Sequence, residues 1–121
     1  MINRLEINGI HLRVDDDLKR YVHRKIGRLD RYISRRIRQS VHVEVKLIEQ
    51  KSKDKKECTC EATAYLPYEV INVHESTINM YAAVDIVETK LKLQLKKYKE
   101  MHSTPKLRHR FLAHIRRTSQ S

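Results

Sequence analysis

The amino-acid sequence predicts one α+β domain in the order strand, helix, three strands, helix. Two observations lead to this fold class. Apolar residues recur at steps of three and four in two separate stretches, which is the period of a helix with one buried side. Between these stretches apolar and polar residues alternate, which is typical of strands with one buried face. A chain of 121 residues also has the usual length of a single domain.

The first strand and the first helix are expected within residues 5–33. Leu5 and Ile7 indicate a short strand near the start of the chain. Asp15 stands where a helix N-cap belongs, and Gly27 interrupts the helical pattern at a cost of about 1 kcal/mol. The buried side of this helix is expected to consist of Val14, Leu18, Tyr21, Val22, Ile26, Leu29, Tyr32 and Ile33.

Three more strands are expected between the helices. Alternation of apolar and polar residues predicts strands over residues 41–47, 58–66 and 68–74. Pro67 marks the turn between the last two. Residues 50–56 are all polar and are expected to form a connecting loop. Because short turns join these strands, they should pair antiparallel.

The second helix is expected from about Met80 to His102, with Asn79 as its N-cap and Pro105 ending the pattern. Its buried side should consist of Met80, Ala83, Val84, Val87, Leu91, Leu95 and Tyr98. One four-stranded sheet with both helices packed on one face buries every apolar stripe. The predicted domain therefore covers residues 1–102, and residues 103–121 form a basic tail, either flexible or a short helix.

The charge of the chain is strongly positive and unevenly placed. Lysine and arginine number 26 against 15 acidic residues, a formal net charge of +11. Residues 15–38 hold nine basic and four acidic residues, and residues 88–121 hold ten basic and two acidic ones. Both segments include a predicted helix, so packing the helices side by side would pool their charge on one surface. Such a surface attracts polyanions, either nucleic acid or an anionic membrane.

Other features of the sequence narrow the class of function. No apolar run is long enough to span a bilayer, and the N-terminal residues lack a signal-peptide pattern, so a cytoplasmic protein is expected. Cys58 and Cys60 would point to one face of a strand, as buried free thiols in a reducing compartment. The seven histidines show no metal-ligand spacing. We expect no metal, cofactor, small-molecule substrate or enzymatic activity.

Six consecutive residues open the second helix with a distinctive motif. The run is Met80-Tyr81-Ala82-Ala83-Val84-Asp85, followed by Lys90-Leu91 and by Gln94-Leu95-x-Lys97. It resembles the hallmark of the ribosome hibernation promoting factor family, which includes the ribosome-associated inhibitor A proteins: Met-Tyr-Ala-Ala-Ile-Asp, then Lys-Leu-x-x-Gln-Leu-x-Lys. The first helix has similar residues at Leu18, Val22, Lys25, Leu29 and Tyr32. The resemblance covers about residues 1–102 and is to the short type of the family, without a second domain.

The resemblance implies a fold similar to double-stranded RNA-binding domains. It also implies binding to the small ribosomal subunit and its rRNA, in the channel for messenger RNA and the anticodon ends of transfer RNA, so that initiation is blocked under stress. The RNA-binding residues that we predict are Arg24, Lys25, Arg28, Arg31, Lys90, Gln94 and Lys97. Leu93 stands where many family members have arginine, so one expected RNA contact is missing.

Three functions remain open at this point. The first is a translation inhibitor on the small subunit, monomeric away from the ribosome. The second is a general double-stranded RNA binder. The third is a membrane-surface or partner-binding module that uses Phe111, Leu112 and Ile115 of the tail. Four helix tyrosines, Tyr21, Tyr32, Tyr81 and Tyr98, are expected in the core, and packing rather than base stacking is favoured for Tyr65 and Tyr68. Whether the protein promotes ribosome pairing is not decided by the sequence.

Overall fold

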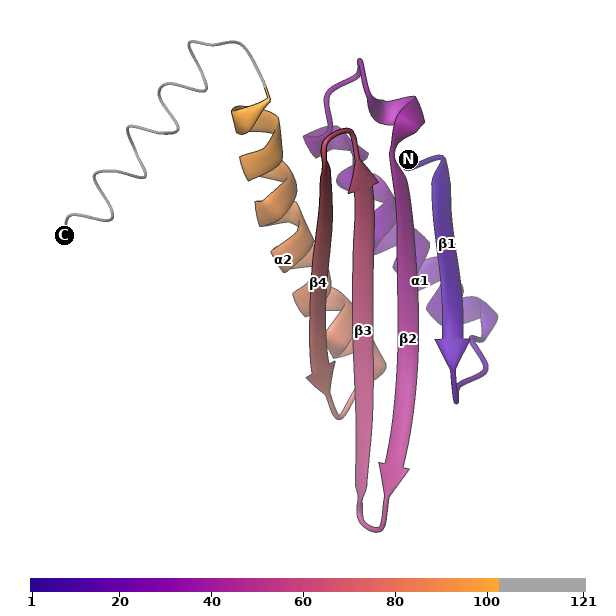
Figure 1. Cartoon of the computed structure of the whole chain (residues 1–121). Coiled ribbons are helices and arrows are strands. Elements are labelled where there is room, and N and C mark those ends of the chain that lie inside the picture. Colours follow the sequence, from indigo (N-terminus) through magenta and orange to yellow (C-terminus); the bar gives the residue numbers. More distant parts are fainter. Residues whose placement is uncertain (103–121) are drawn as a thin grey trace, which may run out of the picture.

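The computed structural model describes residues 1–102 of the chain as one four-stranded sheet with two helices behind it (Figure 1). The elements are β1 (Arg4–Ile10), α1 (Asp16–Gly27), the short 3-10 helices η1 (Arg28–Tyr32) and η2 (Arg38–Ser40), β2 (His42–Ser52), β3 (Lys55–Leu66), β4 (Glu69–Thr77) and α2 (Met80–Met101). The predicted order and the α+β class are confirmed. The predicted tail, residues 103–121, lies outside the described residues.

The sheet is mixed, with its strands in sequence order from β1 to β4. β1 and β2 run parallel because α1 carries the chain back across the sheet between them. β2, β3 and β4 pair antiparallel, as the short connections predict. The helices cover one face and leave the other open to solvent (Figure 1). This open sheet face consists of the outward residues of the strands, among them Glu6, Glu44, Lys46, Glu61, Tyr65 and Val70.

The core lies between the sheet and the two helices. Val22 and Ile26 of α1 and Leu91 of α2 have no exposed surface. Burial of each such side chain stabilises the fold by about 1.5–3 kcal/mol relative to exposure. Asp15 accepts a hydrogen bond from the Leu18 amide at 2.8 Å, and Asn79 accepts one from the Tyr81 amide at 2.8 Å. Both predicted N-caps are therefore confirmed, and the caps fix where each buried stripe begins.

The first helix is shorter than predicted. α1 ends at Gly27, and the chain continues through η1 to Tyr32. The Ile2 amide donates to the Gly27 carbonyl at 2.8 Å, and a Cβ atom at Gly27 would lie 2.8 Å from the Met1 side chain. The Ile2 hydrogen bond holds the N-terminal segment against the end of the helix, whereas the Met1 contact is with the far end of a flexible, exposed side chain. The apolar spacing continues through the 3-10 turn, which is why the sequence predicts one longer helix.

The connection between β2 and β3 also differs from the prediction. Most of residues 50–56 belong to the two strands, which remain paired as far as Ser52 and Lys55. A solvent-exposed pair of strands and a loop are both rich in polar residues, so composition alone does not distinguish between these two structures. β4 likewise begins at Glu69 rather than at residue 68, because Tyr68 has a φ of 70° and forms the turn. Tyr68 is 97% exposed, so the packing expected for it is wrong.

The two cysteines are buried free thiols, as predicted. Burial raises the pKa of Cys60 to about 12, with a smaller contribution from Glu61, so this thiol stays protonated at neutral pH. Neither helix in residues 1–102 combines the length and the apolar character needed to cross a membrane.

Candidate nucleic-acid interface

The two helices meet through a small cluster of polar and aromatic side chains. The Tyr21 hydroxyl of α1 donates a hydrogen bond to Asp85 of α2, and the Tyr21 and Tyr81 rings meet edge to face at 4.9 Å. Lys25 places its Nζ 3.6 Å from Oδ1 of Asp85. The hydrogen bond to Asp85, with burial and the carboxylate charge, raises the pKa of Tyr21 to about 12. Asp85 of the sequence motif thus joins α1 to α2.

Further along the helices a groove opens between them, rich in positive charge. It has a volume of about 190 Å³ and is lined by Lys25, Arg28, Leu29, Arg31, Tyr32, Glu88 and Lys92. We call it the interhelical groove. Four of these side chains are cationic and one, Glu88, is anionic. Neither Arg28 nor Arg31 forms an ion pair with a carboxylate of residues 1–102. An anion in the groove would therefore meet donors that the described part of the protein does not already neutralise.

Tyr32 lies at the centre of the positive charge. The Nζ atoms of Lys92 and Lys96 each lie 5.3 Å from the centroid of its ring, within range of cation–π attraction. Partial burial would raise the pKa of Tyr32, but the hydrogen bond and charge of Lys92, with the charges of Arg31 and Lys96, outweigh it and lower the pKa. The direction of the shift follows from the cations gathered around the ring.

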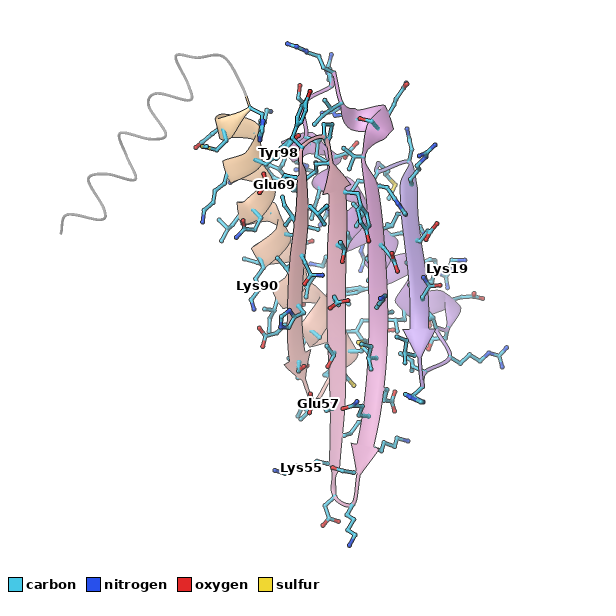
Figure 2. The ribbon with its side chains drawn as sticks, in the orientation of Figure 1. Lys19, Lys55, Glu57, Glu69, Lys90 and Tyr98 are labelled. Carbon is cyan, nitrogen blue, oxygen red and sulfur yellow. The ribbon has the colours of Figure 1, made fainter. Side chains whose placement is uncertain are left out.

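The other flank of α2 faces the edge strand β4. Lys90 donates to Oε2 of Glu75 at 2.6 Å and to the carbonyl of His74 at 3.1 Å, and Figure 2 shows it beside β4. Lys90 lowers the pKa of Glu75 through this hydrogen bond and its charge. Gln94 and Lys97 follow Lys90 at four and seven residues, so the 3.6-residue period places them on the same flank. Both are exposed.

The predicted RNA-binding residues therefore fall into two groups. Lys25, Arg28 and Arg31 line the interhelical groove. Arg24 lies next to it, with its guanidinium 5.2 Å from the centre of the Tyr21 ring. The second group, Lys90, Gln94 and Lys97, lies on the β4 side of α2. The helices do pack side by side, but Lys25 lies against Asp85 on the α1 side of α2 and Lys90 lies against Glu75 on the β4 side, so the expected pooling of the helix charge on one surface is wrong for these two lysines.

The sequence did not identify Tyr32 and Lys92 of the groove, or Lys96, which lies beside it over the Tyr32 ring. Lys92 and Lys96 lie seven and eleven residues after Asp85, on the side of α2 that faces α1. This spacing can be read from the sequence, but the sequence does not say which element packs against each side of α2. Tyr32 was expected in the core with Tyr21 and Tyr81. Tyr98 is buried there, with its hydroxyl donating to the Pro67 carbonyl at 2.6 Å. Tyr21 and Tyr32 are partly buried and pack against the core, whereas Tyr81 is 38% exposed.

The open sheet face is not comparably basic in the described residues. The open sheet face carries Glu6, Glu44 and Glu61, and its Lys46 lies 4.0 Å from Glu44. Leu93, in place of the family arginine, is 53% exposed on the outer side of α2. Among residues 1–102 no three histidine, cysteine or acidic side chains come together as metal ligands.

Known proteins resemble this chain over nearly the whole described domain. The family described as Sigma 54 modulation protein / S30EA ribosomal protein matches residues 5–103. A ribosome hibernation promotion factor from Staphylococcus aureus (strain COL) is 31% identical over 96 residues, which cover 79% of this chain and 48% of that protein. The chain thus spans about half the length of this curated relative.

Two solved structures share the fold. The N-terminal domain of Thermus thermophilus Protein Y superposes with a TM-score of 0.59 and 27% identity, over 77% of this chain and 94% of that one. A ribosomal subunit interface protein from Coxiella burnetii gives a TM-score of 0.60 and 25% identity, over 79% and 97%. The resemblance drawn from the helix motif is confirmed, and the chain belongs to the Sigma 54 modulation protein / S30EA ribosomal protein family, that of the ribosome hibernation promoting factors.

Proposed function

We propose that this protein is a ribosome hibernation factor that binds rRNA of the small ribosomal subunit and blocks messenger and transfer RNA binding in the decoding channel. The interhelical groove is the observation that carries the proposal, because it gathers Lys25, Arg28, Arg31 and Lys92 around a single acidic side chain. The relatives named as a ribosome hibernation promotion factor and a ribosomal subunit interface protein support the ribosome as the partner.

The proposed mechanism requires no chemistry on the RNA. Arginine and lysine side chains neutralise phosphates and release counterions, which supplies most of the affinity and makes it fall steeply with salt. The helices are held in place by the core and by the Tyr21–Asp85 hydrogen bond. A folded domain docked by its helical face would then exclude other RNAs by occupying their space. We propose that the protein acts in the cytoplasm, is a monomer away from the ribosome and has no enzymatic activity.

A sedimentation experiment tests the proposal. Purified small subunits are incubated with the protein, with and without an excess of free duplex RNA that carries the same number of phosphates. The proposal predicts that the protein sediments with the subunits and that the duplex competes poorly. Bound protein should also reduce the binding of a labelled messenger RNA and of initiator transfer RNA.

The competing outcomes have distinct meanings. Equal competition by the duplex would identify a general double-stranded RNA binder rather than a ribosome factor. Undiminished messenger and transfer RNA binding on saturated subunits would place the protein outside the decoding channel and overturn the blocking mechanism.

A further inference from the structure

The β2–β3 hairpin extends well beyond the rest of the sheet. Pairing of β1 with β2 ends at Ile10 and Ile48, and pairing of β3 with β4 ends at Cys58 and Thr77. β2 and β3 continue to pair with each other until Ser52 meets Lys55. Residues 49–57, which we call the lysine ribbon, thus project as two strands with free edges (Figure 1). The ribbon holds four residues of β2 (49–52) and three of β3 (55–57), and four strand residues correspond to a projection of roughly 14 Å.

The core does not account for the length of this ribbon. The last fully buried residues of the two strands are Leu47 and Cys58, and every residue from 50 to 57 is exposed. An open hollow of about 660 Å³ lies between the ribbon and His11, so the β2 edge has no covering element there. A two-stranded ribbon without a hydrophobic face is marginally stable. A hairpin closed nearer Leu47 would serve the fold equally well.

The ribbon carries four lysines against three acidic residues, Glu49, Asp54 and Glu57, a net charge of +1, and it has no apolar side chain between Gln50 and Lys56. Glu49 lies 3.8 Å from both Lys51 and Lys56 and partly neutralises these two. Lys53 and Lys55, at the tip, form no ion pair within residues 1–102. Protein interfaces depend on buried aromatic or aliphatic anchors, which this tip lacks. Lysine, a compact point charge, suits contact with phosphate oxygens.

From these observations we infer that the lysine ribbon is a second RNA-contacting surface, which binds phosphates of an rRNA segment that the interhelical groove does not reach. The inference rests on the proposed function. Arg28 and Arg31 follow the C-terminal end of α1, where β2 begins, whereas the ribbon lies at the far end of β2. The two basic surfaces are therefore at opposite ends of the domain. Together they would bind the RNA at two points and fix the orientation of the protein.

The test uses the full chain and purified small subunits, and measures affinity as a function of salt. In one variant residues 51–56 are replaced by Asn-Gly, which removes two strand pairs and leaves a two-residue turn between Gln50 and Glu57. A second variant carries K53Q and K55Q. At about 0.15 M salt each should bind roughly tenfold more weakly, and the slope of log K against log salt should fall in magnitude by about 1.5.

Two controls keep this result separate from the proposed function. K46Q removes a lysine of the same strand from the open sheet face and should bind like the wild type. R28E with K92E, in the groove, should weaken binding on the order of a hundredfold with the ribbon intact. If the groove variant loses binding while both ribbon variants keep wild-type affinity and slope, the inference is wrong and the proposed function stands.

Two further outcomes would also overturn the inference. Ribbon variants that bind normally but associate with one another in light scattering would show that the lysines only guard the free strand edges. A wild-type protein that does not bind small subunits would overturn the proposed function, and this inference with it.

Discussion

The two flanks of α2 carry similar numbers of lysines but differ in what those lysines do. On the α1 side, Lys92 and Lys96 lie over the ring of Tyr32, next to the arginines of the interhelical groove. On the β4 side, Lys90 is held by a carboxylate and a backbone carbonyl of the edge strand. Lys92 and Lys96 form no ion pair within residues 1–102, whereas Lys90 uses its charge to attach the helix to the sheet.

The comparison shows that a basic residue is a candidate for RNA binding only when its local partners leave it available. Lys90 is one of the predicted RNA-binding residues, yet its amine already lies 2.6 Å from Glu75. RNA would have to displace that exposed pair. Arg28 and Arg31 of the groove have no ion pair within residues 1–102 that RNA would have to displace. We therefore expect the α1 flank to supply most of the affinity, and the following experiments test that difference.

Reversal of charge in the groove should have the largest effect. R28E with K92E should weaken small-subunit binding on the order of a hundredfold, since two phosphate contacts are lost and repulsion is added. The matched variant, K90E with K97E, makes the same change of charge on the β4 flank and should lose much less. Gradient sedimentation measures both, and circular dichroism confirms that both are folded. Equal losses of affinity in the two variants would show that the two flanks of α2 contribute equally to binding.

Single neutral substitutions should sharpen the comparison. R31Q should lower affinity about fivefold at about 0.15 M salt and reduce the magnitude of the salt slope by about 0.8, as expected for one phosphate contact. K97Q is its partner on the other flank and should change the slope by less. Titrations at four or more salt concentrations measure both slopes. A larger change for K97Q would mean that the β4 flank faces the RNA.

The connection between the helices can be weakened without a change of charge. Y21F removes the hydroxyl that donates to Asp85 and should lower the free energy of unfolding by about 1 kcal/mol, measured by urea denaturation. The folded pKa of Tyr21, about 12, lies above the ordinary value of 10.0. Its stabilisation is therefore complete below the ordinary value and disappears as pH rises through the folded one. An unchanged stability in Y21F would show that the hydrogen bond contributes nothing.

The smallest expected effect concerns the pair on the β4 flank. E75Q removes the carboxylate that binds Lys90 and should lower the urea midpoint slightly at neutral pH. The pKa of Glu75 is lowered, so its stabilisation is present above the ordinary carboxyl range and is lost as pH falls through the folded pKa. Wild type and E75Q should converge once the pH lies below the folded pKa of Glu75. A difference that persists there would have another cause than the ion pair.

Much of the fold was predictable because each element has its own local signal. Asp15 and Asn79 cap the helices as their side chains predict, and alternation placed the inward residues of β2 and β3 on the helix side. The helix end at Gly27 was not predictable, since it depends on Met1 and Ile2 returning to pack against it. This contact joins residues that are far apart in the sequence, so the local spacing of apolar residues does not reveal it.

The site was predictable in type but not in arrangement. Charge counts and the motif identified two basic helices, and four predicted residues do lie in or beside the groove. The period of α2 separates Lys90 from Lys92 by more than half a turn, but it does not say which of them faces α1. That choice depends on the position of α2 over β3 and β4. Lys96 and Tyr32 could be assigned only after the packing was known.

Site-specific photocrosslinking tests the central claim most directly, because it reports which surface touches RNA in the complex. A photoreactive residue is placed singly at Arg31 in the groove, at Lys97 on the β4 flank and at Lys46 on the open sheet face, and each protein is irradiated on small subunits. We predict abundant crosslinks to rRNA from position 31, fewer from position 97 and none above background from position 46. Crosslinks from position 46 without any from position 31 would contradict the account.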